Sequence, residues 1–274
     1  MPEISRLPRR TVPPPAAAAA SNNLIAIASG KGGVGKTWFA VSLAQALASL
    51  KRKVLLFDGD LGLANVDIQL GLSPTKDLGT YIEGSAPLRG VINPYRDGGF
   101  DIIAGRSGIG SLATLPSQQL NQLRADLLAL AKNYHDVLID LGAGIDRTVR
   151  HLAGPAGLCL VVTNDEPTSL TDAYAFIKVI HGAVPKQDLR LVVNAASDPS
   201  EGRRTYKTLS KACENFLKFS PGLAGVVRRD SKVPQSIRRQ TSLLTQWPGS
   251  NAAIDVSLIA ERVAKRRAGA RARA

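Results

Sequence analysis

Short runs of consecutive apolar residues recur along this chain, and most are apolar at successive positions rather than at every second one. That pattern is typical of strands buried on both faces, as in a parallel sheet. The runs cover residues 24–28, 54–57, 100–104, 137–139, 158–163, 189–193 and 223–227. We therefore predict strands at these seven positions.

Helical periodicity fills several of the segments between those runs. Apolar residues from Phe39 to Leu50 are spaced as one face of a helix. Similar patterns predict helices over residues 117–132 and 169–180, the second capped by Ser169. The alternation of strands and helices predicts one doubly wound α/β domain, with a mostly parallel sheet and helices on both faces.

Composition divides the chain into three segments. Residues 1–22 are rich in Pro and Ala and contain three Arg, which predicts a disordered basic arm. Residues 23–250 hold the strand and helix pattern and form the predicted domain. In residues 251–274, Val256, Ile259 and Val263 mark the apolar face of an amphipathic helix that leads into a basic tail.

The overall composition excludes several classes of protein. A hydrophobic content of 44% argues against wholesale disorder. The chain contains two cysteines, Cys159 and Cys213, which excludes a disulfide framework and a four-cysteine zinc site. No apolar run approaches the roughly 18 residues that a membrane-spanning helix needs. We therefore expect a cytoplasmic protein.

The formal net charge of +13 suggests an anionic partner, such as nucleic acid, lipid head groups, a nucleotide or another protein. Residues 1–22 contribute a net +2 and residues 265–274 a net +5, so +6 remains for the rest of the chain. For the two tails, simple solvation is as good an explanation as a binding role.

The most specific motif lies between the first predicted strand and the first predicted helix. It consists of Gly30, Lys31, Gly32, Gly33, Val34, Gly35, Lys36 and Thr37. This order matches G-x-x-x-x-G-K-[ST], in which glycines let backbone N–H groups close around phosphate oxygens at a helix N-terminus. We expect Lys36 to reach the β- and γ-phosphates and the Thr37 hydroxyl to ligate Mg²⁺.

Carboxylates follow two other predicted strands. Asp58 and Asp60 are two residues apart at the end of the second strand, so their side chains point to the same side. One of them can hold the lysine or the metal shell while the other positions water. Asp140 ends a strand and precedes Gly142, which is the arrangement of a carboxylate that contacts Mg²⁺ through water. Residues 142–146 would then respond to the γ-phosphate. Asp136, at the start of that strand, is expected to be a surface charge.

The strand over residues 191–194 ends in Asn194. An amide side chain carries both a donor and an acceptor, which suits the edge of an adenine ring. An ordinary turn residue is the alternative at this position.

Residues 31–37, with Lys31 directly after the first glycine, resemble the deviant Walker A loop of the MinD/ParA ATPases, which are P-loop NTPases of the SIMIBI class. The resemblance implies an ATP substrate, Mg²⁺ and an ATP-bound homodimer in which Lys31 reaches the phosphates of the opposite subunit. It also implies that Asp60 orients the attacking water beside the metal, that Asp58 supports the loop, and that Asn194 contacts adenine.

Four stretches resemble the FlhG/FleN (YlxH-like) branch of that family. They are residues 60–67, 140–145, 163–174 and 230–248. The resemblance implies control of flagellar number and placement, together with an FlhF-like GTPase and switch-complex or transcriptional partners. Two features depart from the branch. Residues 1–23 lack its Asp-Gln-Ala-x-x-Leu-Arg segment, and Trp38 replaces a small polar residue directly after the nucleotide loop. We count Trp38 among the nucleotide-binding residues, and its side chain either packs inside or changes the dimer surface.

Two surfaces compete for the remaining positive charge. The helix predicted over residues 251–264 is expected to attach weakly to anionic membrane, with packing on the protein core as the alternative. Arg203, Lys207 and Lys211 form a basic stripe if residues 201–219 are helical, which suits nonspecific DNA binding. The resemblance thus implies a Mg-ATP-dependent dimerising ATPase that controls flagellar number or placement, with a ParA-like ATPase that binds DNA nonspecifically as the alternative.

Overall fold

The computed structural model of the chain describes residues 21–106 and 115–271, with side chains described over residues 23–106 and 115–266. The arm predicted for residues 1–22 lies almost wholly outside these ranges. Among the described residues, no helix combines the length and the apolar character that crossing a membrane requires.

Eight strands form one sheet in the order β3-β4-β2-β5-β1-β6-β7-β8. Their bounds are β1 (Ser21–Ser29), β2 (Val54–Gly59), β3 (Asn93–Tyr95), β4 (Phe100–Ile103), β5 (Asp136–Ala143), β6 (Ala156–Thr163), β7 (Asp188–Ala196) and β8 (Gly222–Arg228). All pairings are parallel except that of β3 with β4. The seven predicted strands and the α/β class are confirmed. The three-residue β3, which contains Pro94, carried no sequence signal.

The helices surround this sheet. They are α1 (Lys36–Ser49), α2 (Val66–Leu70), α3 (Leu78–Ile82), the 3₁₀ helix η1 (Leu88–Val91), α5 (Ser117–Ala131), α6 (Arg147–Ala153), α7 (Pro167–Ala183), α8 (Pro199–Leu217), α9 (Lys232–Arg238), α10 (Leu243–Gln246) and α11 (Asn251–Arg271). The prediction that Ser169 caps α7 is wrong. The helix begins at Pro167, and the buried Ser169 hydroxyl lies 2.9 Å from that of Thr163.

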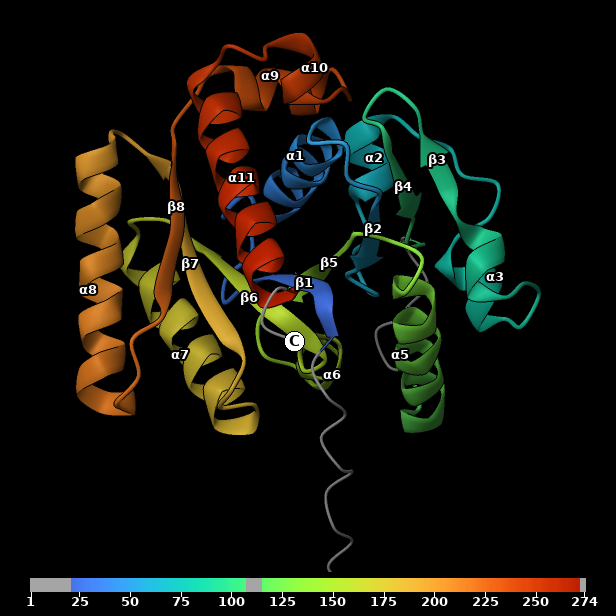
Figure 1. Cartoon of the computed structure of the whole chain (residues 1–274), viewed down its shortest axis with the longest axis horizontal. Coiled ribbons are helices and arrows are strands. Elements are labelled where there is room, and N and C mark those ends of the chain that lie inside the picture. The colour runs from blue at the N-terminus through green and yellow to red at the C-terminus, as the bar shows by residue number, and fades with distance from the viewer. Residues whose placement is uncertain (1–20, 107–114, 272–274) are drawn as a thin grey trace, which may run out of the picture.

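Strand residues alternate between two hydrophobic cores, one on each face of the sheet. In β1, Leu24, Ala26 and Ala28 belong to one core, whereas Ile25 and Ile27 belong to the other. The first core is covered by α5, α6, α7 and α8 and the second by α1, α10 and α11, and Figure 1 shows these groups on opposite sides of the sheet. Continuous apolar strands therefore reflect burial on both faces.

The C-terminal helix α11 differs from the expectation of a membrane-attached helix. Val256, Ile259 and Val263 are each at most 4% exposed and belong to the core that α1 also lines. Arg266 donates to Asp188 and to the Gly157 carbonyl, and Arg262 donates to the Ala224 carbonyl. The apolar face thus packs on the protein rather than on lipid. Its three large residues are buried against apolar side chains of α1 and β8.

Asp136 also differs from expectation, because it is fully buried and paired with Arg52. Both cysteines are buried in the hydrophobic core. The basic stripe of α8 is confirmed as helical and exposed.

Candidate functional site

The carboxyl ends of β1, β2, β5 and β7 meet at one edge of the sheet, and the predicted site residues gather there. The register pairs Ile27 of β1 and Asp58 of β2 with Asp140 of β5. This is the edge where α/β sheets bind their ligands.

The glycines of the loop between β1 and α1 have two separate roles. Gly33 and Gly35 have φ of 81° and 86°, in the left-handed region that side chains disfavour. Gly30 instead lets the loop lie against α7, because a Cβ at this position would fall 2.1 Å from the backbone carbon of Asp172. The sequence therefore fixes both the turn and the distance between the loop and α7.

We expect Gly30→Ala to destabilise the protein by about 3 kcal/mol, because α7 or the loop must move to admit the methyl group. Urea unfolding without nucleotide measures this effect. Gly32→Ala is the matched control, since a Cβ there meets nothing within 4 Å. Equal stability of the two variants would contradict the close approach of loop and α7.

Lys36 and Asp140 form a buried ion pair at the centre of the site. Lys36 Nζ lies 2.7 Å from Asp140 Oδ1, and the side chains are 8% and 1% exposed. Burial raises the pKa of Asp140, and the Lys36 ammonium and the Thr37 hydroxyl oppose that rise. The lysine predicted to hold phosphate is thus paired with the carboxylate predicted to lie near the metal.

Asp58 organises the segment that follows β2. Its carboxylate accepts hydrogen bonds from the backbone N–H groups of Asp60, Asn65 and Val66. Burial and the charge of Asp140 raise the pKa of Asp58 to about 7. Asp58 therefore holds both the start of the loop and the start of α2, in keeping with its predicted supporting role.

Asp60 lies at the mouth of a hollow of about 450 Å³ between residues 59–63 and residues 142–149. Its Oδ1 accepts from Leu63 N at 3.1 Å, and a Cβ on Gly142 would lie 3.4 Å from that same oxygen. Asp60 is half-buried, whereas Leu63 is 74% exposed. The segment predicted to orient the attacking water and the segment predicted to respond to the γ-phosphate thus face each other across this hollow.

Asn194 supports the phosphate loop directly. Its Nδ2 donates to the Val34 carbonyl at 2.7 Å, and a Cβ on Gly35 would lie 2.4 Å from that nitrogen. The ordinary-turn alternative is therefore wrong, because Asn194 lies inside β7 and is buried. Its role toward adenine stays a prediction, for which the amide oxygen is the acceptor.

Lys31 has different partners from Lys36. Its ammonium donates to Glu166 Oε2 at 2.7 Å and to Thr168 Oγ1 at 2.9 Å, both at the start of α7. Sequence reasoning used residues 163–174 as a marker of the branch and missed this contact. The sequence shows an acidic residue directly before a Pro-Thr-Ser helix start. That this helix start lies beside the loop depends on the pairing of β1 with β6, which the sequence does not show.

Trp38 contributes its ring to the core rather than to the nucleotide site. The side chain is 3% exposed, and its indole N–H has no hydrogen-bond partner in the described part of the chain. The large ring thus packs inside the protein, which is one of its two expected places, and the assignment of Trp38 to the nucleotide site stays a prediction.

Comparison with known proteins agrees with this geometry. Residues 25–243 match the CobQ/CobB/MinD/ParA nucleotide binding domain. The antiactivator FleN of Pseudomonas aeruginosa is 38% identical over 240 residues, which is 88% of this chain and 85% of that protein. The flagellum site-determining protein YlxH of Helicobacter pylori is 32% identical over 220 residues, covering 80% of this chain and 74% of the relative.

The fold is also similar to that of the cell division ATPase MinD of Pyrococcus furiosus, with a TM-score of 0.76 at 24% identity over 90% of this chain and 100% of the other. The site geometry and the sequence matches lead to the same conclusion. The chain belongs to the CobQ/CobB/MinD/ParA nucleotide-binding family and is a MinD/ParA-type ATPase.

Proposed function

We propose that this chain is a Mg-ATP-dependent switch that dimerises with ATP, hydrolyses it to ADP and phosphate, and thereby controls flagellar number or placement in the cytoplasm. The observation that carries the proposal is the different pairing of two lysines in one loop. Lys36 is buried with Asp140, whereas Lys31 is 37% exposed and is held by Glu166 and Thr168. Lys31 is thus available to exchange its partners for the phosphates of a second subunit.

The residues at the sheet edge fit a nucleotide and Mg²⁺. The ammonium of Lys36 and the N-terminus of α1 are suited to phosphate, and the oxygens of Thr37, Asp60 and Asp140 are the hard donors that Mg²⁺ prefers. Among the described residues, no group of three or more His, Cys, Asp or Glu side chains is arranged to hold a metal ion by itself. An ion bound here would share its ligands between these protein oxygens and the phosphates of the substrate.

Each residue then has a defined part in hydrolysis. Lys36 would exchange Asp140 for phosphate oxygens and balance their charge. Thr37 and Asp140 would hold Mg²⁺, and the ion would supply positive charge beside the phosphates. Asp60 orients the attacking water from the hollow beside Gly142. Asp58 keeps Asp60 in place through the hydrogen bond it accepts from the Asp60 backbone.

Lys31→Ala is expected to bind ATP within about threefold of the unchanged protein but to form no ATP-dependent dimer and to lose hydrolysis. The reason is that Lys31 is not engaged with Asp140 or Lys36 in the single chain, so its phosphate contact arises only on assembly. Light scattering with and without ATP, together with phosphate release, measures both properties.

Lys132→Ala, which removes another exposed lysine, serves as the control for that experiment. The dimer switch is refuted if the unchanged protein stays monomeric with ATP, or if Lys31→Ala dimerises as well as the control. Loss of ATP binding in Lys31→Ala would instead assign this lysine to the subunit's own nucleotide.

The flagellar output is supported by the relatives whose printed names are antiactivator FleN and flagellum site-determining protein YlxH. An FlhF-like GTPase, switch-complex proteins and a transcriptional regulator are the proposed partners. The test is to delete the gene in its own host and to count flagella per cell by electron microscopy. Complementation by the unchanged chain, and not by Lys31→Ala, is the expected result, whereas an unchanged flagellar number in the deletion strain excludes this output.

A ParA-like function on DNA is the second candidate, favoured by exposed cations on and around two helices. They are Arg203, Lys207 and Lys211 on α8, with Arg229 and Arg238 around α9. Cosedimentation with random-sequence DNA, with and without ATP, discriminates the two functions. Binding that requires ATP and weakens steeply with salt would favour DNA as the surface on which the switch acts.

A further inference from the structure

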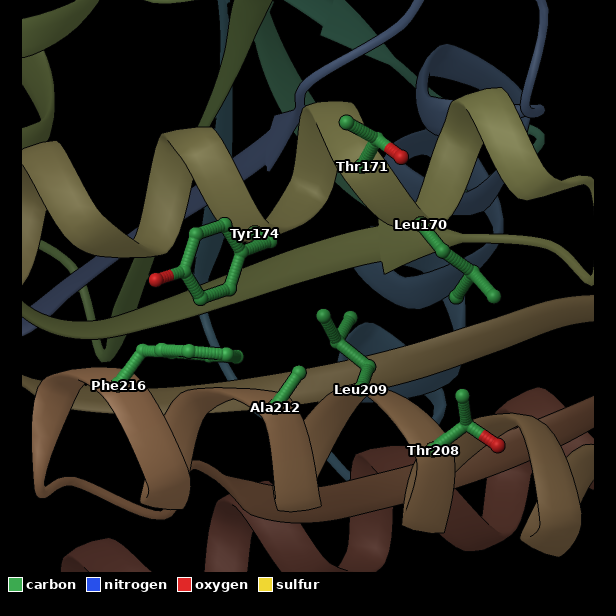
Figure 2. Close-up of a pocket in the computed structure, with 7 residues that line it drawn as sticks. All are labelled: Leu170, Thr171, Tyr174, Thr208, Leu209, Ala212 and Phe216. Carbon is green, nitrogen blue, oxygen red and sulfur yellow. The ribbon is translucent and has the colours of Figure 1, made fainter.

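Helices α7 and α8 leave an apolar groove of about 430 Å³ between them, on the face of the sheet away from α1 and α11. Leu170 and Tyr174 come from α7, and Leu209, Ala212 and Phe216 from α8. Figure 2 shows Tyr174 and Phe216 at one end of the groove, Leu170 and Thr208 at the other, and Ala212 and Leu209 between them. The groove thus runs along both helices.

Phe216 is the unusual member of this set, because it is 76% exposed, the most exposed large hydrophobic side chain among the described residues. Its ring meets Tyr174 edge to face, with centroids 6.5 Å apart, and otherwise faces solvent. A large aromatic side chain exposed beside an apolar hollow is typical of a protein interaction site.

Three basic side chains lie near the groove. Helical spacing places Lys178 one turn after Tyr174 on α7, and Arg204 and Lys211 one position outside the groove-lining face of α8. All three are exposed, and neither Lys178 nor Lys211 forms a salt bridge within the described ranges. An occupant of the groove therefore meets an apolar floor with cationic rims.

We propose that this groove docks an amphipathic helix of a partner protein, with apolar residues on one face and acidic residues beside them. The floor runs from Thr208 to Phe216, which is about two helical turns, and suits apolar anchors at i, i+3 or i+4, and i+7 of a partner helix. The chain's own residues 1–20 do not fit, because Arg6, Arg9 and Arg10 outnumber Glu3 there. This inference goes beyond the proposed switch and does not depend on ATP hydrolysis.

Nucleic acid is less suited to this site than an acidic helix. Phosphates interact with the cations but gain nothing from an apolar floor, and nonspecific DNA binding needs no hollow between helices. The combination of Phe216, Tyr174 and the flanking lysines therefore favours a partner that is both apolar and acidic.

Fluorescence anisotropy with three synthetic peptides of about 16 residues tests the proposal. The first is helical, with Leu at groove spacing and Glu beside it; the second replaces Glu with Lys; the third keeps the acidic composition in scrambled order. We expect the first peptide to bind at least tenfold more tightly than the other two, roughly the effect of one good interface anchor.

Variants of the chain locate the binding. Phe216→Ala and Lys211→Glu are each expected to weaken the first peptide about tenfold, and both positions are exposed, so the fold is spared. Leu258→Ala on α11, where Leu258 is 46% exposed, is the matched control and should bind normally. ATP binding, measured in parallel, should be unchanged in all three variants.

Several results would overturn the proposal. Equal binding of the ordered and scrambled acidic peptides would mean that charge alone is recognised, and displacement of the first peptide by random-sequence DNA would make nucleic acid the occupant. Self-association that Phe216→Ala abolishes, seen by sedimentation without nucleotide, would assign the groove to a second copy of the chain. Unchanged peptide affinity in Phe216→Ala would place the binding elsewhere.

Discussion

Lys36→Ala is expected to abolish ATP binding and also to destabilise the protein by about 3–5 kcal/mol, as loss of one member of a buried ion pair does. Both effects follow from one contact, because the ammonium that is positioned for phosphate also neutralises Asp140, which is 1% exposed. Without Lys36, burial raises the pKa of Asp140 with less opposition, and the site retains a carboxyl group that must be protonated to stay buried.

A double variant separates the two effects. Adding Asp140→Asn to Lys36→Ala removes the unpaired carboxylate, so most of the lost stability should return while ATP binding stays absent. Urea unfolding gives the first quantity and isothermal titration with Mg-ATP the second, with Lys132→Ala as the control. ATP affinity within about threefold of normal in Lys36→Ala would disprove the phosphate role of this lysine.

Asp60→Ala is expected to trap an ATP-bound dimer that hydrolyses ATP at least about 100-fold more slowly, because a positioned acid–base group typically contributes that much. Asp60 is half-buried beside the hollow between residues 59–63 and 142–149, and within the described residues its carboxylate accepts a hydrogen bond from the Leu63 backbone. Removing the carboxylate should therefore cost catalysis while sparing the fold and the phosphate loop.

Light scattering after addition of ATP, followed by phosphate release over time, measures both properties. Asp97→Ala, at an exposed carboxylate, should dimerise and turn over normally. A variant of Asp60 that hydrolyses ATP like the control would remove this residue from the reaction, whereas a variant that is monomeric with ATP would refute the switch.

Much of the fold followed from local sequence patterns. Consecutive apolar residues marked the buried parallel strands, because each of these strands is covered on both faces. The glycine spacing of residues 30–37 identified the phosphate loop, since positive φ at Gly33 and Gly35 is a local requirement. These features depend only on residues close together along the chain, so they can be predicted from the sequence.

The features that could not be predicted from the sequence depend on contacts between residues far apart along the chain. The amphipathic pattern of α11 is the same for a helix on lipid and for one packed on β8, and only the tertiary fold distinguishes them. Asp136 looked like a surface charge because its counter-ion, Arg52, lies 84 positions away. The partners of Lys31 were missed for the same reason, as Glu166 is 135 positions along the chain.

The packing of α11 on α1 has a consequence for how the protein becomes active during synthesis. The Gln45 side chain of α1 donates a hydrogen bond to Thr245 of α10, which lies 200 residues later in the chain. Helix α11 follows α10. The helix that begins with Lys36 and Thr37 therefore gains part of its core only after α10 and α11 have been synthesised. Contacts between residues so far apart in sequence form late and make folding slower, so nucleotide binding should mature after these helices emerge rather than when the phosphate loop first appears.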